Sequence, residues 1–71
     1  AKYIPVIAEQ GVIAYLRKNE DSVCFIAVNV SGHTKEINLP KEIKDYKRYF
    51  GNAPQNDLII LNDREFTVIA K

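Results

Sequence analysis

The sequence has few of the residues that usually stabilise a small domain from outside its core. Its 71 residues include one cysteine, Cys24, and one histidine, His33, with no tryptophan and no methionine. A single cysteine excludes an internal disulfide, and one cysteine with one histidine is too few for a zinc site, which takes three or four protein ligands. A core of this size supplies only ~3–5 kcal/mol without such support. We therefore expect no cofactor and no metal, and look to a partner surface as the missing source of stability.

Charge and hydropathy exclude two classes of partner. The ten basic and nine acidic residues leave a net charge of +1, whereas nucleic acids and anionic membranes attract strongly basic surfaces. The longest uncharged apolar run, Val23 to Val28, is far shorter than the ~20 residues of a transmembrane helix. Because methionine is missing even at position 1, we expect residues 1–71 to form a single domain excised from a longer chain.

Short segments with strand periodicity and polar turns between them indicate an all-β fold. Pro5 places the first segment at a sheet edge. Within Val12–Lys18, alternate residues point in opposite directions. Six or seven such strands predict a small antiparallel β-sandwich of the Greek-key type. The segments are Tyr3–Ala8, Val12–Lys18, Val23–Val30, Thr34–Leu39, Asp45–Phe50, Leu58–Leu61 and Phe66–Ala70.

The segment after Pro40 has features of both a helix and a strand. Lys41–Phe50 also has apolar residues at helical spacing, and Pro40 is suited to start a helix. Its aromatic content favours a turn followed by a strand over Asp45–Phe50. The last two strands are expected to form a closing hairpin around Asn62–Glu65.

The strand Val23–Val30 is apolar on both faces, unlike a strand with one face in water. Cys24, Ile26, Val28 and Val30 lie on one face. Val23, Phe25 and Ala27 lie on the second face, with Asn29 as its polar member. Ile13 and Tyr15 on the neighbouring strand are expected to extend the second face. Because a small sandwich covers only one face with its own second sheet, we expect the other face to dock on a foreign surface.

Several motifs together resemble the C-terminal domain of the α-amylase superfamily, which includes neopullulanases, cyclomaltodextrinases and oligo-glucosidases. In that domain a strand ending in Ala-Tyr-x-Arg precedes a turn and an apolar strand ending in Asn-Phe-Ser, and a Leu-x-Pro-Tyr-Glu-x-x-Val segment closes the chain. Two departures are Val30 in place of Phe and Asp63-Arg64 in place of Pro-Tyr. The matching stretches are Gly11–Arg17, Phe25–Ser31, Tyr49–Asn52, Leu58–Leu61 and Glu65 with Val68.

The resemblance implies a non-catalytic accessory domain. In such hydrolases of starch and maltodextrins, the catalytic carboxylates lie in a preceding (β/α)8 barrel, on which this domain packs. The docking and structural candidates in this chain are Tyr15, Cys24, Phe25, Ile26, Val28 and Asn29, and self-association of the isolated domain through the same face is a further expectation.

No catalytic residue is identified from the sequence. The nine acidic residues, Glu65 among them, fall in turns or on outward faces, whereas glycoside hydrolysis needs two carboxyl groups across one bond. His33 is assigned to an exposed turn, and Cys24 to an apolar strand. Asn29-Val30-Ser31 matches a glycosylation sequon, but we expect Asn29 to be buried and bonded to the following turn.

Two other functional classes remain as alternatives. One is a free-standing carbohydrate- or protein-binding sandwich, which for an α-glucan would use Tyr3, Tyr15, Tyr46 or Tyr49 as exposed, coplanar stacking surfaces. Tyr15 is instead expected to pack, with its hydroxyl bonded to a polar neighbour. The other alternative is an immunoglobulin-like spacer, which would have neither a docking face nor an aromatic platform.

Overall fold

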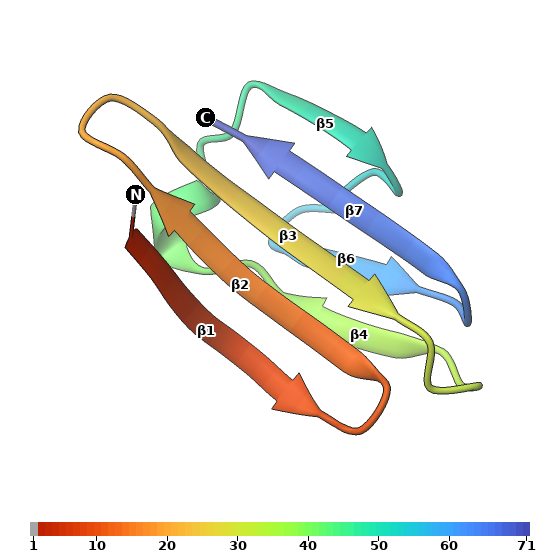
Figure 1. Ribbon diagram of the computed structural model, residues 1–71. Coiled ribbons are helices and arrows are strands. Elements are labelled where there is room, and N and C mark those ends of the chain that lie inside the picture. Colours follow the sequence, from red (N-terminus) through yellow and green to blue (C-terminus); the bar gives the residue numbers. More distant parts are fainter. Residues whose placement is uncertain (1) are drawn as a thin grey trace.

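The computed structural model describes residues 2–71 and shows two antiparallel sheets packed face to face (Figure 1). The large sheet has five strands in the order β1-β2-β3-β7-β5, and the small sheet pairs β4 with β6. The all-β, antiparallel sandwich predicted from the sequence is confirmed. The strands are β1 (Lys2–Glu9), β2 (Val12–Lys18), β3 (Val23–Asn29), β4 (Lys35–Asn38), β5 (Arg48–Gly51), β6 (Leu58–Leu61) and β7 (Glu65–Ala70).

The core lies between the two sheets and follows from the alternation of the strands. Val12, Ala14 and Leu16 of β2 are buried, while the residues between them face away. Phe25 and Ala27 of β3 continue this layer, and a strand's alternation places them all on the inner face. The residues that close the core from the small sheet, the short helix and β7 are Ile37, Leu39, Ile43, Ile59, Leu61 and Ile69.

The segment after Pro40 differs from its prediction. A 3-10 helix, η1 (Lys41–Ile43), begins after Pro40, and the strand β5 begins at Arg48 rather than at Asp45. Ile43 is buried and Tyr46 packs against the core at a spacing of three residues, which matches the period of a 3-10 helix. The turn is closed by the backbone N–H of Ile43, which donates to the Pro40 carbonyl at 3.0 Å. The strand therefore does not extend back to Asp45, because Ile43 and Tyr46 pack into the core instead.

The predicted closing hairpin is wrong. β6 pairs with β4 in the small sheet, whereas β7 pairs with β3 and β5 in the large one, so residues 62–64 form a corner between layers (Figure 1). Arg64 has a left-handed backbone, with φ 65°, and its N–H donates to the Asn29 carbonyl at 2.7 Å. This corner lets Leu61 and Ile69 face the same interior from opposite sides.

The edge strands carry two irregularities. β1 lies at an edge, as Pro5 predicted, and its pairing with β2 contains a bulge between Pro5 and Ile7. At the other edge, β5 ends at Gly51, whose φ is 84°, and a side chain at this position would collide with the carbonyl oxygen of Phe66. Glycine is therefore required for β5 to lie against β7.

Candidate functional site: the outer face of the large sheet

The outer face of the large sheet points away from the small sheet and is apolar across all five strands. Cross-strand partners share a face of a sheet, so the register defines three rows. The first row is Ala8, Ile13, Val28 and Phe66, and the second is Pro5, Tyr15, Ile26, Val68 and Phe50. The third row is Tyr3, Arg17, Cys24, Ala70 and Arg48. We call these three rows the outer face.

Large side chains of the outer face are open to water. Ile13 is 59% exposed, Phe50 is 67% exposed and Phe66 is 49% exposed. At the centre, Ile26 and Val68 are half-buried by their neighbours. A sheet face that lies in water normally carries polar side chains, so the outer face has the composition of a buried surface without a cover.

The candidates named from the sequence separate into two groups. Tyr15, Cys24, Ile26 and Val28 belong to the outer face, whereas Phe25 is fully buried in the core. The expectation that Ile13 and Tyr15 extend the face of Phe25 is wrong, because they lie opposite Val28 and Ile26. Sequence reasoning missed Phe50, Phe66 and Val68, which reach the outer face only because β7 and β5 add to the sheet beyond β3.

A shallow apolar hollow lies on the outer face between β1 and β2. Its volume is about 380 Å³, and its walls include Tyr3, Pro5, Ile13 and Tyr15. The rings of Tyr3 and Tyr15 lie 6.0 Å apart with a tilt of 53° between their planes. Within residues 2–71 the Tyr15 hydroxyl makes no hydrogen bond, so its expected polar partner is missing. The tilted pair walls an apolar hollow and does not form a flat stacking platform.

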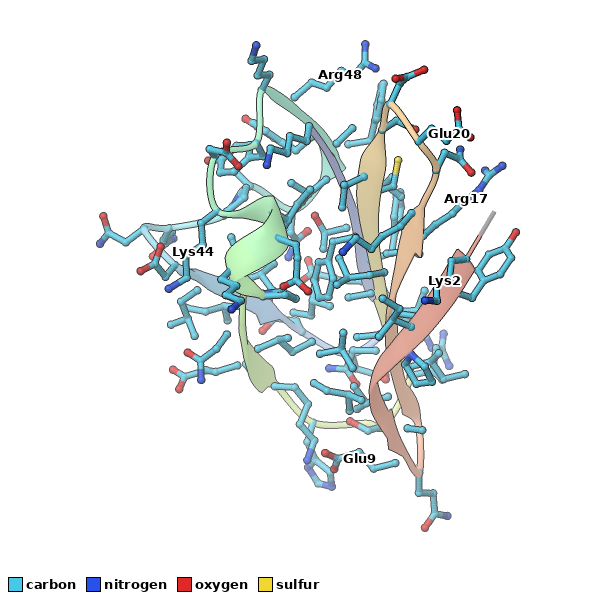
Figure 2. All side chains as sticks on the ribbon, turned by 90° about the vertical axis from the view of Figure 1, so that its left-hand side faces the viewer. Lys2, Glu9, Arg17, Glu20, Lys44 and Arg48 are labelled. Carbon is cyan, nitrogen blue, oxygen red and sulfur yellow. The ribbon has the colours of Figure 1, made fainter. Side chains whose placement is uncertain are left out.

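Within residues 2–71, the only charged side chains that the register places on the outer face are Arg17 and Arg48. Both stand in the third row, at the end of the sheet where β2 and β7 finish. Figure 2 shows Arg17 projecting away from the layer that carries Lys44, with Arg48 near the same end of the molecule. Among the described residues neither arginine forms an ion pair, since the four ion pairs involve Lys35, Arg64, Lys44 and Lys71.

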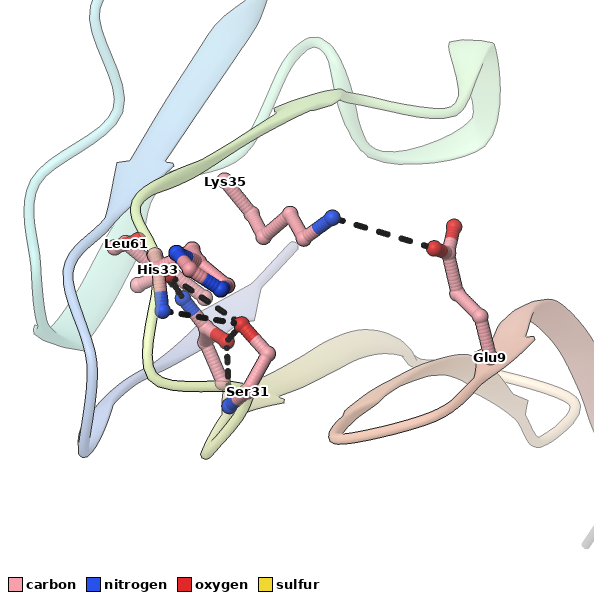
Figure 3. A network of polar contacts seen from close by, with 6 residues as sticks. Glu9, Ser31, His33, Lys35 and Leu61 are labelled. Carbon is pink, nitrogen blue, oxygen red and sulfur yellow. Dashed lines mark hydrogen bonds and ion pairs between the residues drawn. The ribbon is translucent and has the colours of Figure 1, made fainter.

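Asn29 is a structural residue at the opposite, inner side of β3. It is fully buried, and its Nδ2 donates to the carbonyls of His33 at 2.7 Å and Leu61 at 2.8 Å. Its Oδ1 accepts from the N–H and the hydroxyl of Ser31, at 3.0 and 2.7 Å (Figure 3). The predicted bonding of Asn29 to the following turn is confirmed. A side chain buried and bonded in this way is closed to glycosylation in the folded protein.

A second polar cluster, which sequence reasoning missed, holds the corner before β7. Asn52 Nδ2 donates to the Ile60 carbonyl at 2.9 Å and to Glu65 Oε1 at 2.8 Å, and Glu65 also accepts from the Asn62 N–H at 2.7 Å. The bond from Asn52, followed by that from the Asn62 backbone, lowers the pKa of the Glu65 carboxyl. Glu65 is therefore half-buried and bonded rather than a free loop charge.

The remaining candidates show no arrangement suited to chemistry. His33 lies in an exposed turn, as predicted. Within residues 2–71, no three His, Cys, Asp or Glu side chains lie close enough together to hold a metal ion. No helix in this part of the chain has the length and apolar character needed to cross a bilayer.

Comparisons of the chain with protein-family models, with curated proteins and with solved structures gave no match.

Proposed function

We propose that this chain is the non-catalytic C-terminal β-sandwich of an α-amylase-type glycoside hydrolase acting on α-glucans. Its role is to pack on the catalytic (β/α)8 barrel and stabilise it. The proposal combines the motif resemblance of the sequence with the uncovered outer face of the large sheet.

The outer face is the observation that carries the docking part of the proposal. A five-stranded sheet spans about 19 Å across its strands, and three rows span about 14 Å along them. These dimensions give roughly 270 Å² in projection, close to the largest apolar patch of a typical soluble monomer, which is often functional. Covering the outer face removes apolar surface from water at ~25 cal/mol per Å², without involving any residue in catalysis.

The positions of the motif residues support a structural role. The first two stretches of the resemblance contain β2 and most of β3, which are neighbouring strands of the large sheet. The polar motif residues Asn29, Asn52 and Glu65 are engaged in hydrogen bonds that hold loops and corners. These contacts give the three residues structural roles that need no contact with a substrate.

The outer face also fits a protein-binding module better than a sugar-binding one. A site for an α-glucan would be distinguished from a protein-binding site by a pair of exposed, coplanar tyrosines. Tyr3 and Tyr15 are tilted by 53°, and Tyr46 packs against the core. Glucan binding by this chain is therefore the less favoured alternative.

The proposal is tested by reading the coding sequence upstream of Ala1 and expressing the whole gene product. We expect a (β/α)8 barrel with a pair of catalytic carboxylates, and hydrolysis of maltooligosaccharides. In that enzyme Phe50→Ser with Phe66→Ser should speed thermal inactivation and leave KM unchanged, whereas Glu36→Ser on the small sheet should change neither. An upstream sequence without a barrel would refute the proposal.

A further inference from the structure

The two arginines of the outer face indicate which charges a surface packed on this face would need. They stand in the same cross-strand row, separated by Cys24 and Ala70. Three strand spacings place their Cα atoms about 14 Å apart. The register brings no carboxylate of the five strands onto this face, and within residues 2–71 neither arginine forms an ion pair.

We propose that the outer face docks on an apolar protein surface that presents two carboxylates, about 14 Å apart, to Arg17 and Arg48. The partner also inserts a large apolar side chain into the hollow between β1 and β2. This proposal rests on the proposed function in one respect: it takes the partner surface to be the catalytic domain of the same polypeptide.

Charge complementarity favours such a partner over a second copy of this chain. In a face-to-face dimer with its two-fold axis along the strands, the arginine rows meet and repel each other. With the axis across the strands, each arginine row lies over the apolar row of Ile13, Val28 and Phe66. Neither arrangement supplies a carboxylate to the arginines, and a lack of electrostatic complementarity disfavours a partner surface. The outer face is thus built for a different surface.

The two parts of the outer face have separate roles in docking. The first two rows and the hollow supply apolar contact, which is non-directional. The arginine row lies at one end only, so ion pairs there set which way round the sheet sits on its partner. Charged pairs at the rim of an interface commonly fix register and exclude wrong partners in this way. Arginine suits this role because its planar fork binds a carboxylate through two hydrogen bonds.

The docking proposal is tested by photo-cross-linking in the whole gene product. A p-benzoylphenylalanine replaces Tyr15 beside the hollow, or Glu36 on the small sheet as the control. We expect the Tyr15 probe to cross-link within the same polypeptide, outside residues 1–71, to an apolar surface bordered by acidic residues. The Glu36 probe should give no cross-link to that surface.

Charge reversal then tests the arginines. Arg17→Glu and Arg48→Glu should each lower the Tyr15 cross-link yield at least fivefold, and changing the mapped carboxylate opposite Arg17 to lysine should restore the yield in the Arg17→Glu protein. Lys41→Glu, an exposed change on η1, should alter the yield less than twofold. Both arginines are exposed, so we expect the variants to fold, and circular dichroism of the whole gene product checks this.

The outcomes separate the two proposals. Three outcomes would overturn the docking inference even if a barrel is present. They are cross-links between two copies of the chain, a mapped surface without carboxylates, and an unchanged cross-link yield in the arginine variants. If the mapped surface is acidic and apolar but belongs to a domain that is not a barrel, the proposed function is wrong. The inference that Arg17 and Arg48 pair with carboxylates of the partner surface then still stands.

Discussion

The two faces of the large sheet use similar residues in different surroundings. On the inner face, Leu16, Phe25 and Ile69 are buried by the small sheet and η1. On the outer face, Ile13, Phe50 and Phe66 are of the same hydrophobic type but remain open to water. Hydrophobicity alone therefore does not distinguish the core of this domain from its exposed outer face; cover by the second layer does.

The largest effect should come from removing a core ring. Phe25→Ala should destabilise the chain by ~3–5 kcal/mol, because burial of the ring is lost and a cavity remains. This approaches the whole stability of a domain this small, so the variant should be unfolded at 25 °C by circular dichroism. The matched change on the outer face, Phe66→Ala, should cost only about 1 kcal/mol, since half of that ring is already exposed. Equal losses for the two variants would contradict the distinction between the faces.

The next effect concerns the buried polar end of β3. Asn29→Ala leaves the carbonyls of His33 and Leu61 without their donor, and an unpaired buried group costs ~1–3 kcal/mol. We expect a loss of about 2–4 kcal/mol in urea unfolding. Asn38→Ala, on the exposed side of β4, should stay within about 0.5 kcal/mol of wild type. A small effect at Asn29 would show that water replaces its bonds.

Attachment of β5 depends on Gly51. Gly51→Ala and Gly32→Ala both place a side chain in a left-handed backbone, at about 1–2 kcal/mol. The new Cβ at Gly51 also meets the Phe66 carbonyl, while the one at Gly32 has no neighbour within 4 Å. Thermal melts should therefore show the greater loss for Gly51→Ala, and hydrogen exchange should show faster exchange in β5. If the two variants melt alike, β5 adjusts freely against β7.

A smaller effect should follow from the pH dependence of the corner cluster. The folded-state pKa of Glu65 lies below its ordinary value of 4.5. The Glu65 carboxylate thus adds stability above pH 4.5, and this is lost as the pH falls from there through the lowered folded pKa. In urea unfolding from pH 7 to pH 3, Glu65→Gln should flatten the acid decline, and Glu20→Gln in the exposed β2–β3 turn should not. If the free energy of unfolding of Glu65→Gln falls with pH as steeply as that of the wild type, this cluster does not contribute to the loss of stability in acid.

The smallest effect on stability should come from the outer face itself. Ile13→Thr should change the free energy of unfolding by no more than about 0.5 kcal/mol, as for most surface substitutions. It should nevertheless reduce the binding of a hydrophobic dye such as ANS to the 71-residue chain, because Ile13 walls the apolar hollow. Dye binding that is unaffected by Ile13→Thr would place the exposed apolar surface elsewhere.

Local sequence was sufficient to predict most strands and the alternation of faces within β2 and within β3, but not which face of β2 adjoins which face of β3. The alternation in Val12–Lys18 and the position of Asn29 at a strand end are properties of neighbouring residues, and both predictions are confirmed. The strand over Asp45–Phe50 was predicted with the wrong start because Ile43 and Tyr46 take their places from the core beneath the sheet.

By itself, the sequence determined most of the strands and the apolar character of both faces of β3, because each depends on residues close together in the chain. Only the tertiary structure decided that β6 and β7 part at a corner and that β7 enters between β3 and β5. That choice depends on long-range pairing and on burial of Leu61 and Ile69 in a shared interior, for which neighbouring residues give no signal. It also brings Arg17 and Arg48, far apart in the chain, into one row of an uncovered apolar face.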